Sequence, residues 1–84
     1  MSGYALHPQV GLRRERFGAL AYHYGNRRLT FLNDDTLLAV VQSPTLRTDV
    51  DAALTDAGVP ADRRGAYRIA LSRLADAEVL VASD

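Results

Sequence analysis

The chain has 84 residues, of which 48% are hydrophobic and 24% charged. A chain of this length folds as one small domain and buries roughly 63% of the surface that its unfolded form exposes. That is enough for one modest core and too little for a stand-alone enzyme with a cofactor cleft between two lobes. Ten basic and ten acidic residues cancel, which argues against an electrostatic grip on nucleic acid or on an anionic membrane.

The sequence holds no cysteine, which excludes disulfides, thiolate metal sites and a cysteine nucleophile. Every basic residue is arginine, and the planar guanidinium group suits bidentate recognition of carboxylates. The amino terminus lacks the basic and apolar blocks of a signal peptide, and no apolar run approaches membrane-spanning length. We therefore expect a cytoplasmic protein without a membrane segment.

The first third of the chain has strand character. Apolar residues alternate with small or polar ones from Val10 to Leu12, and they cluster from residue 17 to 32 around the pair Gly25-Asn26. Gly-Asn predicts a two-residue hairpin turn, because glycine and asparagine tolerate positive φ. Positions whose numbers sum to 51 then face each other. A strand near 10–13, turning near residues 15–16, completes a three-stranded antiparallel sheet with the 28–33 strand at its edge.

This register divides the hairpin residues between two faces of the sheet. The larger and more apolar set is predicted to face the core: Leu20, Tyr22, Tyr24, Arg27, Leu29 and Phe31. The other set is predicted to lie on the opposite face: Ala19, Ala21, His23, Arg28, Thr30 and Leu32.

Three helices are predicted after residue 33. Asp34 or Asp35 can cap the first, which Pro44 ends. Thr48 opens the second in a capping-box pattern, and Gly58 is its left-handed stop. Apolar residues recur at helical spacing in each helix: Leu37, Leu38 and Val41; then Val50, Ala53, Leu54 and Ala57; then Tyr67, Ala70, Leu71, Leu74 and Ala77.

Pro60 suits the first turn of the third helix. The closing segment, residues 79–81, is expected to be an extended tail that packs on the core. The predicted fold is α+β, a single domain over 1–84 with strands at about 9–33 and helices at about 34–77. Three helices beside a small sheet resemble a winged helix-turn-helix, a shape that DNA-binding and peptide-binding modules share.

The residues that usually carry chemistry have structural explanations. His7 and His23 are isolated in the sequence, so a zinc site is not supported, and His23 is expected to be an exposed or half-buried strand residue. The serines lack a nucleophile-elbow pattern, and Asp34-Asp35 is typical of a helix cap. We predict no catalytic residue, no metal and no cofactor.

Residues 6–13, Glu15, residues 17–23 and residues 27–32 together form a pattern that resembles the mycofactocin biosynthesis chaperone family. That family belongs with the small chaperone of pyrroloquinoline quinone biosynthesis among the precursor-peptide recognition domains. The resemblance covers nearly the whole chain and includes Ala57-Gly58-Val59-Pro60. Arg14 stands where the resemblance leads us to expect proline.

The resemblance implies a non-catalytic role. Such a chaperone binds the leader of a short precursor peptide and presents it to a radical S-adenosylmethionine maturase, which acts on the peptide's terminal Val-Tyr. The iron–sulfur chemistry belongs to the maturase, because this chain has no cysteine to ligate a cluster. The implied partners are the leader and the maturase, with no nucleic acid and no membrane, and the chain is expected to be a monomer or a weak dimer.

An exposed strand edge can bind an extended peptide through main-chain hydrogen bonds. The 28–33 strand is the expected template, and the resemblance places the groove between it and the third helix. The predicted peptide-binding residues on the strand are Arg28, Leu29, Thr30, Phe31 and Leu32. Those on the helix, implied by the resemblance, are Arg64, Tyr67, Arg68 and Leu71.

A winged-helix DNA-binding regulator is the alternative. Its recognition helix would normally carry a basic face, whereas the second helix has Arg47 near its start against Asp49, Asp51 and Asp56. This acidity disfavours insertion into a DNA groove.

Overall fold

The computed structural model describes residues 3–16 and 18–83. Its central sheet has the antiparallel order β2-β3-β4, made of β2 (Val10–Glu15), β3 (Gly18–His23) and β4 (Leu29–Leu32). A second sheet pairs β1 (Gly3–Leu6) with β5 (Leu80–Ser83). The α+β class with a three-stranded antiparallel sheet is confirmed, and the expected extended tail is β5. Phe17, the first residue of the predicted hairpin segment 17–32, lies outside the described residues.

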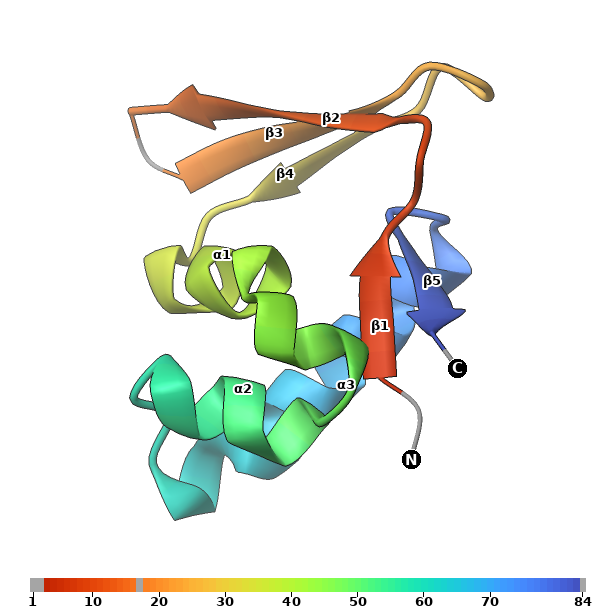
Figure 1. Ribbon diagram of the computed structural model, residues 1–84. Coiled ribbons are helices and arrows are strands. Elements are labelled where there is room, and N and C mark those ends of the chain that lie inside the picture. The colour runs from red at the N-terminus through yellow and green to blue at the C-terminus, as the bar shows by residue number, and fades with distance from the viewer. Residues whose placement is uncertain (1–2, 17, 84) are drawn as a thin grey trace.

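The helices are α1 (Asp35–Gln42), α2 (Val50–Asp56) and α3 (Arg64–Asp76), with 3₁₀ turns at Pro44–Arg47 and Ala61–Arg63. They gather on one side of the central sheet, with α1 nearest to it, and the β1-β5 ribbon stands beside them (Figure 1). Within the described residues, no helix combines the length and apolar character needed to cross a membrane.

Aspartates begin two of the three helices. The Asp34 carboxylate accepts hydrogen bonds from the backbone N–H groups of Thr36 and Leu37, as expected for a cap. The prediction that Thr48 opens α2 was wrong, because Asp49 is the residue whose side chain accepts from the Ala52 N–H. Thr48 instead ends the preceding 3₁₀ turn, which leaves Asp49 as the extended residue at the helix start.

The hairpin between β3 and β4 keeps the predicted register with a different turn. Leu20 faces Phe31 and Tyr22 faces Leu29, so paired numbers sum to 51. The two-residue turn was wrong, because β3 ends at His23 and a loop over residues 24–28 follows. The left-handed residue described in this loop is Arg27, with φ 63°. Its N–H donates to the His23 carbonyl at 2.8 Å, which closes the turn.

The predicted orientation of the central sheet was wrong. Ala19, Ala21 and Leu32 are buried against the helices, whereas Leu29 is 61% and Phe31 is 52% exposed. Small alanine side chains let α1 pack close to β3. We call the opposite, solvent-facing side the outer sheet face; its apolar residues are Leu20, Tyr22, Tyr24, Leu29 and Phe31.

The core joins the three helices to β5 and to the inner face of the central sheet. The apolar stripes predicted for α1, α2 and α3 supply part of it, including Leu38, Leu54 and Leu71. The largest fully buried side chains are Leu38, Val40, Leu46, Leu54, Leu71 and Leu80.

Candidate functional site

Strand β4 has one paired and one free side within the described residues, because it ends the order β2-β3-β4. The His23 N–H donates to the Arg28 carbonyl at 3.0 Å, so these two residues form a hydrogen-bonded pair. In an antiparallel hairpin, hydrogen-bonded and non-hydrogen-bonded pairs alternate along the strands. The backbone groups of Thr30 and Leu32 therefore point toward β3, and those of Leu29 and Phe31 point outward. The free edge thus offers two N–H donors and two carbonyl acceptors from one short strand.

A hollow of about 110 Å³ lies between α1 and α3, close to the point where β4 ends. It is lined by Asp34, Leu37, Arg63, Ala66, Tyr67 and Ala70. Tyr67 donates its hydroxyl to Asp34 Oδ2 at 2.9 Å. Partial burial and this hydrogen bond raise the pKa of the Tyr67 hydroxyl above its ordinary value. Tyr67 therefore stays neutral and fixes the start of α1 against α3.

The helix residues expected at the site lie on two different faces of α3. Arg64 donates to the Asp51 carbonyl and to Thr55 Oγ1, and Arg68 pairs with the Asp51 carboxylate. Leu71 is 0% exposed. Among the four residues named from the resemblance, Tyr67 is the one that lines the hollow. Arg63, Ala66 and Ala70 stand there in place of the others.

The five strand residues named at the site also divide by face. Leu29 and Phe31 lie on the outer sheet face, whereas Leu32 is buried and Thr30 is half-buried on the inner face. Arg28 is exposed just before β4 begins. The two faces of this edge therefore differ: Leu29 and Phe31 are exposed on the outer side, and Thr30 lies on the inner side.

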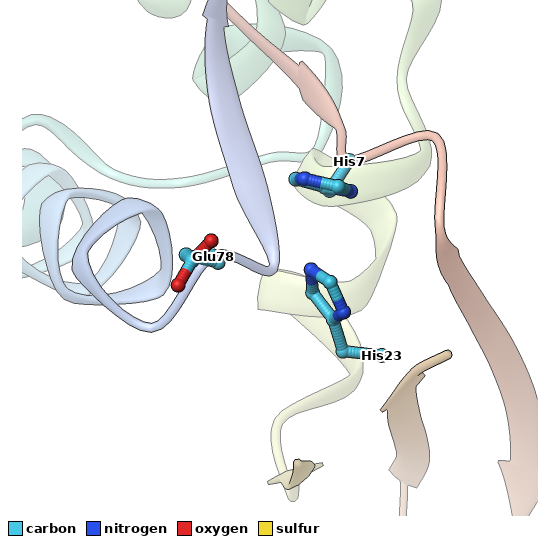
Figure 2. A group of neighbouring side chains, drawn as sticks. All are labelled: His7, His23 and Glu78. Atoms are coloured by element: carbon cyan, nitrogen blue, oxygen red, sulfur yellow. The ribbon is translucent and has the colours of Figure 1, made fainter. Parts of the chain in front are cut away.

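Two histidines and a glutamate lie close together at the end of the central sheet where β2 begins and β3 ends (Figure 2). His7 lies between β1 and β2, His23 ends β3, and Glu78 follows α3 with φ 64°. The histidine rings have centroids 4.3 Å apart, and potential ligand atoms of the three residues lie within 4.8 Å of one another. The fold therefore brings together two histidines that are isolated in the sequence. The expected exposure of His23 was wrong, because its residue surface is 5% accessible.

The hydrogen bonds of both rings do not suit a metal bound at Nε2. His7 Nδ1 accepts from the Gln9 N–H, and His23 Nδ1 accepts from the N–H groups of Gly25 and Asn26, all at 3.0–3.1 Å. A neutral ring that accepts at Nδ1 carries its proton on Nε2. Metal binding at Nε2 would require the other tautomer and would break these bonds. The buried His23 Nε2, which has no hydrogen-bond partner in the structure, therefore carries the proton of the neutral ring.

The fold and the site define a small α+β domain with a free strand edge on β4 within the described residues. Within the described residues, no serine hydroxyl is seen to hydrogen-bond to a histidine; the Ser43 hydroxyl accepts from the Thr45 N–H. The model of the Peptide chaperone MftB family matches residues 3–81, and the chain belongs to this family. The resemblance found in the sequence is thereby confirmed, and the family is non-catalytic.

Relatives in three mycobacterial species carry the name Peptide chaperone MftB. The chain is 48% identical over 79 residues to the protein of Mycobacterium tuberculosis and to that of Mycobacterium ulcerans, which covers 94% of this chain and 72% of each relative. It is 45% identical over 76 residues to the protein of Mycolicibacterium smegmatis, which covers 90% of this chain and 74% of the relative. No solved structure matches the chain.

Proposed function

We propose that this domain binds the leader of a ribosomally made precursor peptide along the free edge of β4 and presents it, in the cytoplasm, to a radical S-adenosylmethionine maturase of mycofactocin biosynthesis. The outward backbone groups of Leu29 and Phe31 carry this proposal. They are unpaired within the described part of the sheet, and an extended peptide is the ligand that satisfies such a row of groups.

The inner side of the proposed peptide strand would meet α3. The residue opposite Thr30 would point toward the hollow lined by Arg63, Ala66 and Tyr67. Arg63 makes no ion pair with the described residues, so its guanidinium group is available to an acidic leader residue. Backbone pairing supplies affinity in this arrangement, and the hollow supplies selectivity.

Proline substitutions at the edge test the proposal. Leu29→Pro and Phe31→Pro each remove an outward N–H, and we expect each to weaken leader binding about tenfold or more in calorimetric titrations. Thr30→Pro is not informative, because the Thr30 N–H points toward β3 and its loss would disrupt the sheet itself.

The opposite edge of the sheet supplies a matched control. The same alternation directs the Arg14 backbone outward on the free side of β2, so Arg14→Pro removes an equivalent N–H far from β4. This variant should bind the leader as the parent chain does. Equal weakening by Arg14→Pro and Phe31→Pro, or unchanged binding by both β4 variants, would contradict the proposal.

A further inference from the structure

The outer sheet face is an apolar surface that the helices leave uncovered. Tyr24, Leu29 and Phe31 are three of the four exposed large hydrophobic residues in the described part of the chain. A hollow of about 430 Å³ is centred on this face. Its lining combines β2, β3 and the hairpin: Gly11, Leu12, Arg13, Leu20, Tyr22, Tyr24 and Leu29.

Aromatic side chains shape one wall of this hollow. The Tyr22 and Tyr24 rings pack edge to face, with centroids 4.9 Å apart. Tyr24 lies over β2 because Gly11 has no side chain there: a Cβ at Gly11 would come within 2.9 Å of the Tyr24 hydroxyl oxygen. The Tyr24 N–H also donates to the Gln9 carbonyl at 2.7 Å. The wall is therefore held in place before any partner binds.

The proposed peptide cannot fill this hollow. Neighbouring strands lie about 4.8 Å apart, so a strand added to β4 would be about 14 Å from β2. Its side chains would reach Leu29 and Phe31 on the outer sheet face but not Gly11 or Arg13. The part of the face over β2 and β3 therefore fits a second partner that binds beside the peptide.

We propose that the outer sheet face is the docking surface for the maturase, an inference that rests on the proposed function above. A peptide strand on β4 would continue this face, because every second peptide side chain would lie beside Leu29 and Phe31. The maturase would then contact a composite surface of chaperone and peptide. Bound peptide should accordingly raise the affinity of the chaperone for the maturase, and the maturase should raise the affinity for the peptide by the same factor.

Charge at the rim favours this occupant over a second copy of the chain. Arg13 lines the hollow, and Arg27 lies in the loop at its hairpin end. Among the described residues, Glu15 is the acidic residue that forms an ion pair with an arginine of this rim, Arg13. A symmetric dimer through this face would set its arginines against one another. The matching surface is therefore apolar with an acidic rim, and it belongs to a different protein.

Aspartate substitutions on the outer sheet face test the proposal against a matched control. The double variant Leu20→Asp/Tyr24→Asp places carboxylates in the hollow away from the free edge. Ile69→Asp makes the same change at a residue of α3 that is 58% exposed and does not line the hollow. Affinity for the leader peptide, and affinity for the purified maturase with leader present, are measured separately for each variant.

We expect the double variant to keep leader binding within about threefold and to lose about 30-fold or more in maturase affinity, as when interface anchors are removed. Ile69→Asp should change neither affinity. If the double variant fails to fold, Tyr24→Asp alone, at a side chain that lies largely in solvent, gives the same test.

Unchanged maturase binding by the double variant would overturn the inference. So would a parent chain that sediments as a dimer and becomes monomeric when the outer sheet face is charged, because the occupant would then be a second copy. Failure of the parent chain to bind leader at all would instead contradict the proposed function, so the two failures are distinguishable.

Discussion

Tyr67 of α3 donates its hydroxyl to Asp34 Oδ2 at 2.9 Å, and the other oxygen of the same carboxylate caps α1. Asp34 follows β4 by two residues. One carboxylate thus joins the end of the proposed peptide edge, the start of α1 and the inner wall of the proposed groove. The bond therefore ties the segment between β4 and α1 to α3.

Removing the Tyr67 hydroxyl should therefore weaken the attachment of Asp34 to α3 and lower the stability of the fold. We expect Tyr67→Phe to lower the free energy of unfolding by about 1 kcal/mol, the usual contribution of such a hydrogen bond. Tyr24→Phe, which removes a hydroxyl from the outer sheet face, should change it far less. Chemical denaturation followed by circular dichroism measures both. A stability unchanged by Tyr67→Phe would argue against the Tyr67–Asp34 bond.

The same residue gives a pH dependence. Because the pKa of Tyr67 is raised on folding by partial burial and by Asp34, its contribution is fully present below the ordinary tyrosine value of 10.0. It is lost as pH rises through the folded pKa, since the unfolded chain then releases the proton more readily. The difference in unfolding free energy between the parent chain and Tyr67→Phe should shrink as pH rises above that range. A difference that grows with alkaline pH would have the wrong sign.

Gly18 begins β3 in a backbone conformation that other residues avoid. Its φ is +142°, and a Cβ there would collide with the Leu32 carbonyl. We expect Gly18→Ala to cost about 1–3 kcal/mol of unfolding free energy. Gly65 in α3 has no neighbour near its Cβ position, so Gly65→Ala should be neutral or stabilise by up to about 1 kcal/mol. Thermal unfolding measures both variants, and a larger loss of stability in Gly65→Ala than in Gly18→Ala would contradict this prediction.

The histidine cluster should not act as a zinc site. Both Nδ1 atoms accept backbone hydrogen bonds, so each neutral ring carries its proton on Nε2. A molar excess of Zn²⁺ should leave the melting temperature unchanged. His23→Phe should lower the unfolding free energy by about 1–3 kcal/mol, because the loop N–H groups of Gly25 and Asn26 lose their acceptor. A saturable rise in melting temperature with Zn²⁺, abolished by His23→Phe, would contradict this account.

Arg63, just before α3, and Arg68, within α3, should differ in their effect on binding. Arg63 lines the inner hollow, whereas Arg68 pairs with Asp51 of α2. Arg63→Ala should weaken binding of an acidic leader by up to about fivefold at low salt, and less at high salt. Arg68→Ala should leave binding within about twofold, so calorimetry on the two variants decides which face of α3 meets the peptide. A larger effect of Arg68→Ala would move the groove toward α2.

Local signals were sufficient to predict much of the fold. The pairing of Leu20 with Phe31 follows from the position of the turn, and Asp34 and Gly58 mark helix ends by their own chemistry. The face of the sheet that meets the helices was not predictable from apolar bulk alone. Ala19 and Ala21 are buried because a helix packs closely against small side chains, and that choice depends on tertiary packing.

In the candidate site, too, one part could be predicted from local sequence signals and the other depended on tertiary contacts. Its strand edge was predictable, because a hairpin at the end of a three-stranded sheet leaves one side of β4 free. The helix face was not, because Asp51 of α2 holds Arg64 and Arg68 and turns them away from the hollow. The proximity of the two histidines could have been predicted from the strand pairing. Val10 faces His23 in the β2–β3 pair, and Val10 follows His7 by three residues.

Hydrogen exchange measured by NMR tests the central claim most directly. The amides of Leu29 and Phe31 point away from β3, so they should exchange rapidly in the free chain and become protected when the leader peptide binds. The outward amide of Arg14, on the opposite edge of the sheet, should exchange at the same rate with and without peptide. Leader binding that leaves Leu29 and Phe31 unprotected, or that protects Arg14 instead, would contradict the account.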